Sequence, residues 1–370
     1  MTPCLVAGLV LSVLAGSTIA PLVEPPPVAV RKDQWHLESL KMLEAHRFSQ
    51  GDGVVVALPD TGIDLHPDLA GNVLPGTDVT GRGDGRQDKN GHGTSMAGLI
   101  AAHGRSDNTG ALGVAPRAKL LPIRSELFAG RGDTDELAAS IEWAVAHHAD
   151  IVSISAVAGA STRLQQAVQS ALDADIVVVA SAGNRPEDAS VGYPASEPGV
   201  IAVGGTDRNG LHAAISVSGP EVDVAAPAVD IYSTSFGGKY SKGTGTSSAT
   251  AIVAGAAALI RSKYPHLPAE EVAHRLTATA IDKGPPGRDD QYGYGVIDLV
   301  AALTADVPPL GFESTGVTAP APTAAAPGAG GDDGTVQGLA TLGVLLAAGG
   351  GYLIWRRRRR ADDPPPRESR

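Results

Sequence analysis

The chain has 370 residues, 43 % hydrophobic and 19 % charged, so it can bury a sizeable core and is not a disordered protein. The single cysteine, Cys4, excludes a disulfide framework and a cysteine-based zinc site. The formal net charge is −11, and because the last 15 residues carry seven Arg against three acidic residues, the first 355 residues carry −15. A body this acidic argues against nucleic-acid binding.

The first 20 residues have the pattern of a secretory signal peptide. Residues 5–20 are apolar and end in Thr18-Ile19-Ala20, a small-x-small cleavage pattern. No Lys or Arg precedes the apolar stretch, and a short buried helix is the alternative interpretation. We expect a signal peptide at 1–20, followed by a Pro-rich lead at 21–33 that is too short for a folded inhibitory pro-domain.

Strand-like and helix-like segments alternate through residues 34–304. Continuous apolar runs of the kind that form buried parallel strands lie at 54–58, 151–154, 176–180 and 200–203. Between them, Asp133 opens a capping pattern before one helix, and Leu164, Val168 and Leu172 mark one face of another. This order predicts an α/β fold, with a doubly wound, mostly parallel sheet and helices on both faces.

Three short blocks carry the residue types of nucleophilic catalysis. The blocks are Leu58-Pro59-Asp60-Thr61-Gly62, Asn90-Gly91-His92-Gly93-Thr94-Ser95 and Gly243-Thr244-Gly245-Thr246-Ser247-Ser248-Ala249. The first ends a predicted strand, and the other two precede predicted helices. Taken singly they have ordinary interpretations, as a turn aspartate, a loop histidine and a helix N-cap serine. Ser248 is a rival to Ser247 on sequence alone, although the block spacing favours Ser247.

Together the blocks supply a consistent chemistry. A serine hydroxyl is a weak nucleophile until a base takes its proton, and imidazole is the base whose pKa suits neutral pH. A buried carboxylate fixes the imidazole tautomer and stabilises the imidazolium. A fourth block, Ser181-Ala182-Gly183-Asn184, follows another predicted strand, and the amide of Asn184 can donate to a developing oxyanion.

Across residues 33–304 the chain resembles the subtilisin-like serine proteases. The matching blocks are Asp60-Thr61-Gly62, His92-Gly93-Thr94, Ser181-Ala182-Gly183-Asn184 and Gly245-Thr246-Ser247. Weaker matches are Gly192-Tyr193-Pro194-Ala195, Asp223-Val224-Ala225-Ala226-Pro227 and Gly293-Tyr294-Gly295. The resemblance implies a subtilase catalytic domain at 34–304 that acts on protein or peptide substrates, with Asp60, His92 and Ser247 as its triad and Asn184 completing the oxyanion hole. No motif indicates a cofactor or a metal.

Pro59 departs from the family pattern, which usually has an aliphatic residue before the aspartate. Proline has no N–H group to donate to a neighbouring strand. We therefore expect the strand pairing there to be broken locally or to end early.

Two acidic patterns suggest a metal site only weakly. Asp64, His66 and Asp68 alternate like metal ligands, but a polar exit from a strand gives the same pattern. Asp84 and Asp88 lie in a glycine-rich stretch that could hold calcium, but it lacks a spaced carboxylate loop, so we interpret it as a solvated loop.

The C-terminal region has the pattern of a membrane anchor. Residues 336–355 carry no formal charge and as a helix would extend about 30 Å, one hydrocarbon thickness. Tyr352 and Trp355 stand where interfacial aromatic residues occur, and five Arg at 356–360 form a block that stays on the cytoplasmic side. A Gly/Ala-rich core segment is the alternative. We expect a linker at 305–335, a transmembrane helix at 336–355 and a basic cytoplasmic tail at 356–370.

The order of these segments, together with Gln34-Trp35 just before the domain, narrows the resemblance to the mycosins, the membrane-anchored subtilases that accompany type VII secretion systems. It implies a single-pass protein of the cell membrane, with an extracellular catalytic domain and the type VII secretion membrane complex as partner. The alternative is a structural subunit that stabilises a secretion complex, with incidental proteolysis.

Overall fold

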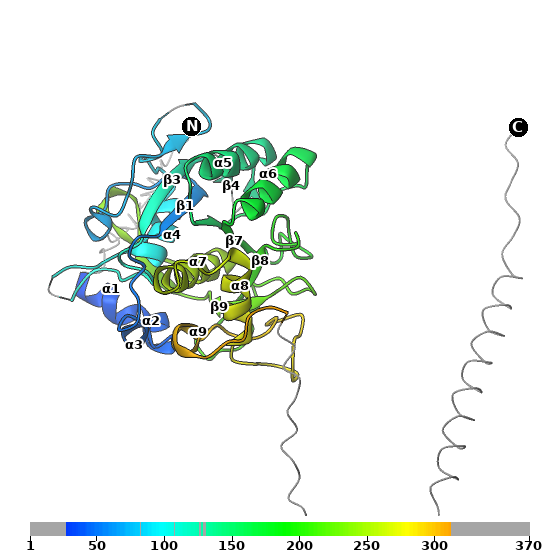
Figure 1. Cartoon of the computed structure of the whole chain (residues 1–370). Helices are drawn as coiled ribbons and strands as arrows, with labels where there is room; N and C mark the ends of the chain where they lie inside the picture. The colour runs from blue at the N-terminus through cyan, green and yellow to red at the C-terminus, as the bar shows by residue number, and fades with distance from the viewer. Residues whose placement is uncertain (1–26, 82, 107, 126, 129–130, 312–370) are drawn as a thin grey trace, which may run out of the picture. The chain divides into compact units, whose positions relative to one another are not determined.

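A seven-stranded parallel sheet forms the centre of the part of the chain that the structure describes (Figure 1). The computed structural model describes residues 27–311 except positions 82, 107, 126, 129 and 130. The strands are β1 (Val55–Asp60), β2 (Thr77–Asp78), β3 (Lys119–Arg124), β6 (Ile151–Ile154), β7 (Val177–Ser181), β8 (Ile201–Thr206) and β9 (Val224–Pro227). Their order in the sheet is β2-β3-β1-β6-β7-β8-β9. The predicted α/β fold with a mostly parallel sheet is confirmed.

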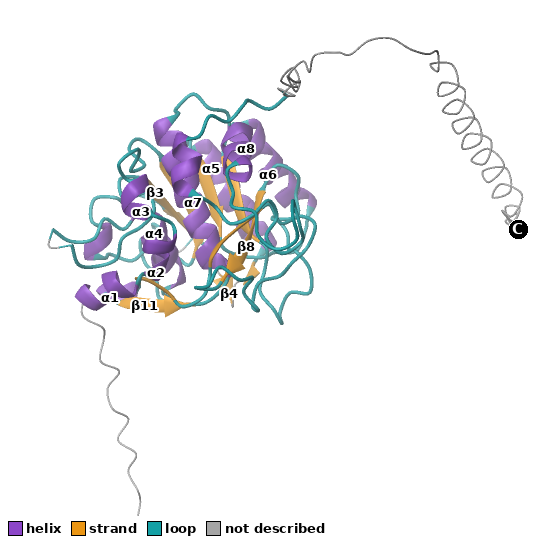
Figure 2. Cartoon of the chain, turned by 90° about the horizontal axis from the view of Figure 1, so that it is seen from below, coloured by secondary structure: helices purple, strands orange, loops and turns teal. Residues whose placement is uncertain are grey.

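Helices cover both faces of this sheet (Figures 1 and 2). One face carries α4 (His92–Ala101), α7 (Thr246–Lys263), α8 (Ala269–Ala278) and α9 (Leu299–Thr304), and the other carries α5 (Thr134–Ala146) and α6 (Thr162–Asp173). Alternate residues of a strand pack against the two helix layers. In β7, Val177 and Val179 pack against the first layer, and Val178 and Ala180 pack against the second. Because both faces of the strands are buried, their sequences are continuous apolar runs.

Several helices and strands begin and end close to where local sequence signals predicted them. The apolar run at 176–180 became β7, and the run at 151–154 became β6. Asp133 caps α5, and its carboxylate accepts the backbone N–H groups of Asp135 and Glu136 at 2.9 and 3.0 Å. Two short antiparallel pairs lie outside the sheet: β4 (Leu127–Phe128) with β5 (Arg131–Gly132), and β10 (Ile231–Thr234) with β11 (Tyr240–Gly243). Single turns of 3-10 helix are η1 (Pro67–Leu69) and η2 (Phe236–Gly238).

Pro59 ends the pairing of β1 on one side only. The ladder between β1 and β6 stops at Ala57 opposite Val152, whereas the ladder between β1 and β3 continues to Asp60 opposite Arg124. The expected early end of pairing is therefore confirmed on the β6 side. It leaves the last residues of β1 attached to the sheet through β3 alone.

Three short helices precede the sheet and pack on the face that carries α4 and α7. They are α1 (Pro27–Asp33), α2 (Trp35–Ser39) and α3 (Met42–Ala45). Val30 of α1 is completely buried, and the side-chain amide of Gln34 donates to the carbonyls of Leu112 and Tyr232 at 3.1 and 3.2 Å. The last part of the predicted Pro-rich lead is thus a helix that belongs to the packed body.

The predicted signal peptide 1–20, transmembrane helix 336–355 and tail 356–370 lie outside the described residues, as does the linker from residue 312 onward. Within residues 27–311, apart from the five gaps, no helix is both long enough and apolar enough to cross a bilayer.

His36 on α2 is completely buried, and neither of its ring nitrogens has a hydrogen-bond partner among the described residues. Burial disfavours the charged ring and lowers the pKa of His36 from 6.5 to about 3. In the unfolded chain the ring binds a proton below pH 6.5, while in the folded chain it stays neutral until about pH 3. Stability is therefore lost as the pH falls through this window.

We predict that His36→Leu reduces the acid sensitivity of folding. The free energy of unfolding of the wild type should fall, because of His36, by about 1.4 kcal/mol for each pH unit below 6.5, and the variant should lack this part of the loss. Denaturant unfolding at pH 7 and pH 4.5 measures it, with His266→Leu at an exposed position as the control. Equal losses in the wild type and His36→Leu would contradict the prediction.

Candidate active site

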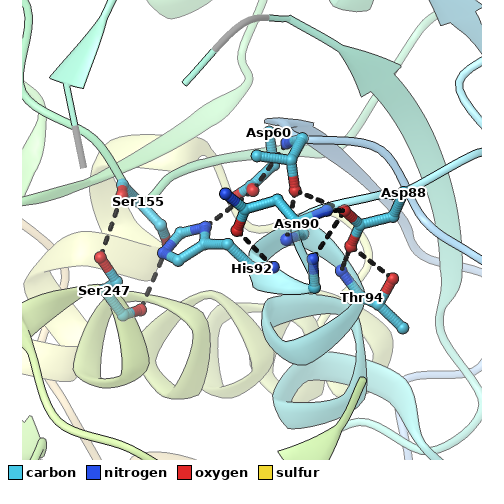
Figure 3. A network of polar contacts seen from close by, with 10 residues as sticks. Asp60, Asp88, Asn90, His92, Thr94, Ser155 and Ser247 are labelled. Carbon is cyan, nitrogen blue, oxygen red and sulfur yellow. Dashed lines mark hydrogen bonds and ion pairs between the residues drawn. The ribbon is translucent and has the colours of Figure 1, made fainter. Parts of the chain in front are cut away.

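The predicted site residues meet at the carboxyl edge of the parallel sheet, where ligands bind in open α/β folds. Asp60 is the last residue of β1, and Asn184 follows the end of β7. His92 is the first residue of α4, and Ser247 is the second residue of α7. Figure 3 shows Asp60, His92 and Ser247 side by side. Four segments far apart in the chain thus contribute to one place.

Asp60 and His92 are joined by a short contact. The Asp60 carboxylate is completely buried, and its Oδ1 lies 2.7 Å from Nδ1 of His92 and accepts the backbone N–H of Thr61 at 2.7 Å (Figure 3). A side chain at Gly93 would meet the carbonyl oxygen of Gly62 at 2.1 Å. Glycine at that position therefore allows the start of α4 to approach the end of β1 closely enough for this contact.

The pKa of His92 reflects opposing effects. Burial disfavours the charged ring and by itself would lower the pKa. The charge and hydrogen bond of Asp60, together with the charge of Asp88, outweigh burial and raise the pKa of His92 above 6.5. The ring is not sealed off, because 27 % of its side-chain surface is exposed.

Ser247 is held at the N-terminus of α7 by the chain that follows β6. Its hydroxyl donates to the backbone carbonyl of Ser155 at 3.0 Å, and the Ser155 hydroxyl donates to the Ser247 carbonyl at 3.2 Å (Figure 3). The Ser247 hydroxyl must therefore rotate away from Ser155 to share its proton with His92. Catalytic hydrogen bonds often tighten only when substrate is bound, so this resting geometry is compatible with a nucleophile and its base.

Asn184 is oriented by the first residue of α7. Its Oδ1 accepts the backbone N–H of Thr246 at 2.9 Å and the Thr246 hydroxyl at 3.1 Å, and its own backbone N–H donates to Asp188 at 2.9 Å. With Oδ1 committed to Thr246, the NH2 group is the part of the amide that can donate to a ligand. The Ser181 hydroxyl lies 2.6 Å from the Thr246 hydroxyl and helps to hold the Thr246 side chain beside Asn184.

A cavity of about 420 Å³ opens beside these residues. His92, Asn184 and Ser247 lie in its wall. Its other lining residues are small or uncharged: Asn90, Gly91, Ser95, Met96, Ser235, Ser241, Gly243, Thr244, Gly245 and Ser248. Three of the four predicted site residues therefore share one cavity that is large enough to receive part of a polypeptide, and Asp60 lies buried behind His92.

Each of the two acidic patterns of the sequence contains a buried aspartate. Asp68 is completely buried and binds Arg105 and the Tyr240 hydroxyl at 3.2 and 2.9 Å, and Asp88 is only 5 % exposed. The interpretation as a solvated loop therefore holds for Asp84, whose side chain is 53 % exposed, but is wrong for Asp88. Among the described residues, no three His, Cys, Asp or Glu side chains gather into a group that could hold a metal ion.

Sequence reasoning missed the supporting residues of the site. Ser155, Thr246 and Asp88 each bind a segment that carries a predicted site residue. The signal that could have found Thr246 is its place within the serine block, and for Asp88 it is its position two residues before the histidine block. Ser155 had no such signal, because its role depends on the loop after β6 meeting the start of α7.

A serine, an imidazole and an amide donor around one cavity, with a buried carboxylate bound to the imidazole, are the groups that serine hydrolases use for acyl transfer. The family model of the subtilases (Peptidase S8) matches residues 51–295. The chain belongs to the subtilase family and is a subtilisin-like serine protease. The resemblance inferred from the motif blocks is confirmed.

Relatives of two kinds are similar to this chain. Subtilisin DY of Bacillus licheniformis is 42 % identical over 258 residues, which cover 68 % of this chain and 92 % of that protein. The crystal structure of MycP1 from Mycobacterium smegmatis has a TM-score of 0.65 at 30 % identity, covering 74 % of this chain and 85 % of that chain. The MycP3 protease from the type VII (ESX-3) secretion system has a TM-score of 0.68 at 32 % identity, covering 77 % and 90 %. The structural neighbours therefore include mycosins.

We predict that His92 titrates above pH 6.5 and that Asp60→Asn lowers this midpoint, because the amide cannot stabilise the charged ring. Titration of the ring proton signals by NMR measures both values. Asp52→Asn, on an exposed surface, is the control that should leave the midpoint unchanged. A wild-type midpoint below 6.5, or no shift in Asp60→Asn, would contradict the electrostatic role of Asp60.

Proposed function

We propose that this subtilase is a membrane-anchored serine endopeptidase whose triad is Asp60, His92 and Ser247, with Asn184 as the oxyanion donor. The observation that carries the proposal is the 2.7 Å contact between the buried Asp60 carboxylate and Nδ1 of His92. This contact leaves Nε2 as the ring nitrogen that can take a proton. The ring and the Ser247 hydroxyl lie in the wall of the same cavity.

The reaction follows from these positions. The Ser247 hydroxyl rotates from Ser155 toward His92 and attacks the carbonyl carbon of the peptide bond while its proton passes to Nε2 of His92. The carbonyl oxygen becomes an oxyanion, which the NH2 group of Asn184 and the N-terminal end of α7 stabilise. The departing amine then takes the proton from His92, and water releases the acyl group from Ser247 by the same steps in reverse.

We predict that Ser247→Ala and His92→Ala each lower peptide hydrolysis by about 10⁵-fold or more, the order of loss seen when a triad member is removed in subtilisin. The double variant should be no worse than either single one, since nucleophile and base act as a unit. Rates on a peptide library, with circular dichroism to confirm folding, measure this.

Ser248→Ala is the matched control, because Ser248 is the neighbouring hydroxyl in the wall of the same cavity. It should retain activity close to that of the wild type. Full turnover by Ser247→Ala, combined with loss in Ser248→Ala, would assign the nucleophile to Ser248 instead.

The setting of the enzyme forms the second part of the proposal. Solved neighbours of this chain include MycP1 and a MycP3 protease described as from a type VII secretion system. With the apolar stretch at 336–355 and five Arg after it, this supports a catalytic domain outside the cell membrane, beside a type VII secretion complex. The alternative, a structural subunit with incidental proteolysis, gives no physical reason for the buried Asp60–His92 contact.

We predict that a chain ending before Val336 is released from membranes and stays active, because the described body ends well before that point. Fractionation of cells and peptide hydrolysis by the soluble fraction measure this. In the full chain, a tag placed after Arg370 should resist protease added to intact spheroplasts. A cleaved tag, or a truncated form that still pellets with membranes, would count against the anchor.

A further inference from the structure

Asp88 is a buried carboxylate that lies just before α4 and outside the proposed triad. Its Oδ1 accepts hydrogen bonds from the Thr61 hydroxyl at 3.0 Å and from the backbone N–H groups of Asn90 and Gly91 at 2.9 and 2.8 Å. Its Oδ2 accepts the backbone N–H and the hydroxyl of Thr94 at 3.0 and 2.6 Å (Figure 3). Five donors therefore converge on one charged group that is 5 % exposed.

These donors belong to the two segments that carry Asp60 and His92. The residues at 90–94 are the turn that carries His92, and they wrap around the Asp88 carboxylate (Figure 3). Thr61 directly follows Asp60, and its hydroxyl also accepts the backbone N–H of Gly93 at 2.9 Å. Asp88 and Thr61 thus connect the chain next to Asp60 with the chain on both sides of His92.

We propose that Asp88 is a positioning residue, whose carboxylate fixes the start of α4 against the end of β1 and so sets the contact between His92 and Asp60. The proposal rests on the function proposed above. It requires the charged group rather than an isosteric amide. All five partners of Asp88 are donors, so an asparagine there would turn its NH2 group against one or more of them and leave them unpaired.

Asp88 acts on His92 through its charge as well as through its hydrogen bonds. The charged groups that act on the ring are Asp60 at the end of β1 and Asp88 in the loop before α4, and both raise the pKa of His92. Removal of the Asp88 charge should therefore move the titration of His92 to lower pH. A residue that only stabilised the fold would leave that titration in place.

The test compares Asp88→Asn with the wild type in the full chain. We expect kcat to fall by about 10- to 100-fold, the effect of a small misplacement of reacting groups, with KM changed by less than about 3-fold. The acid limb of the pH–rate profile should move to lower pH. Asp84→Asn, at an exposed carboxylate earlier in the same loop, is the matched control and should match the wild type in kcat, KM and pH profile.

Two outcomes overturn the proposal. One is a folded Asp88→Asn enzyme whose kcat and acid limb equal those of the wild type. The other is an unchanged kcat in Thr61→Val, which serves as the test if Asp88→Asn does not fold. Thr61→Val removes only the hydroxyl between Asp88 and Gly93. A several-fold fall in kcat in Thr61→Val supports the proposal, and an unchanged kcat overturns it.

A readout that does not depend on turnover separates this proposal from the proposed function. In the Ser247→Ala background, NMR titration of His92 should show a lower midpoint when Asp88→Asn is added, and an unchanged midpoint would overturn the role of Asp88. If the wild type hydrolyses no peptide, the proposed function fails, while this titration still decides what Asp88 does.

Discussion

The close approach of α4 to the end of β1 is the constraint on which the site depends. It brings His92 within 2.7 Å of a completely buried carboxylate, Asp60. Two features of the sequence allow it: glycine at position 93, where any side chain would meet the Gly62 carbonyl, and the Asp88 carboxylate that holds the turn before the helix. Because Asp60 is the last residue of β1 and pairs with Arg124 of β3, its position is fixed by the sheet and not by a loop.

The second half of the site depends on α7. This helix packs against β6, β7, β8 and β9, and its residues from Thr246 to Arg261 are buried. The small residue Gly255 lets the helix also approach the segment between α4 and β3, where a Cβ atom on Gly255 would lie 2.5 Å from the side chain of Val114. The N-terminus of this packed helix places Ser247 beside Ser155 and Thr246 beside Asn184. A rigid scaffold thus supplies the precision that catalysis requires.

Features that depend on neighbouring residues, such as apolar runs and helix caps, could be predicted from the sequence. Features that depend on contacts between distant segments could not. The strands could be predicted because a doubly covered parallel strand is a continuous apolar run, and α5 could be predicted from its capping Asp133. Asp88 was misjudged because a glycine-rich acidic stretch has the composition of a solvated loop. Its burial arises from donors that converge only after α4 has packed against β1. The link between Ser155 and Ser247 joins residues 92 positions apart, which no local pattern can reveal.

The central claim is that the hydroxyl of Ser247, with His92 as its base, is the nucleophile of this protease. A fluorophosphonate probe tests it most directly, because such a probe reacts covalently with a serine only when that serine is activated. The full chain is labelled, digested and mapped by mass spectrometry, with His92→Ala treated in parallel. The account predicts one adduct, on Ser247, that is absent in His92→Ala. An adduct on Ser248, or no adduct on the folded wild-type protein, would contradict it.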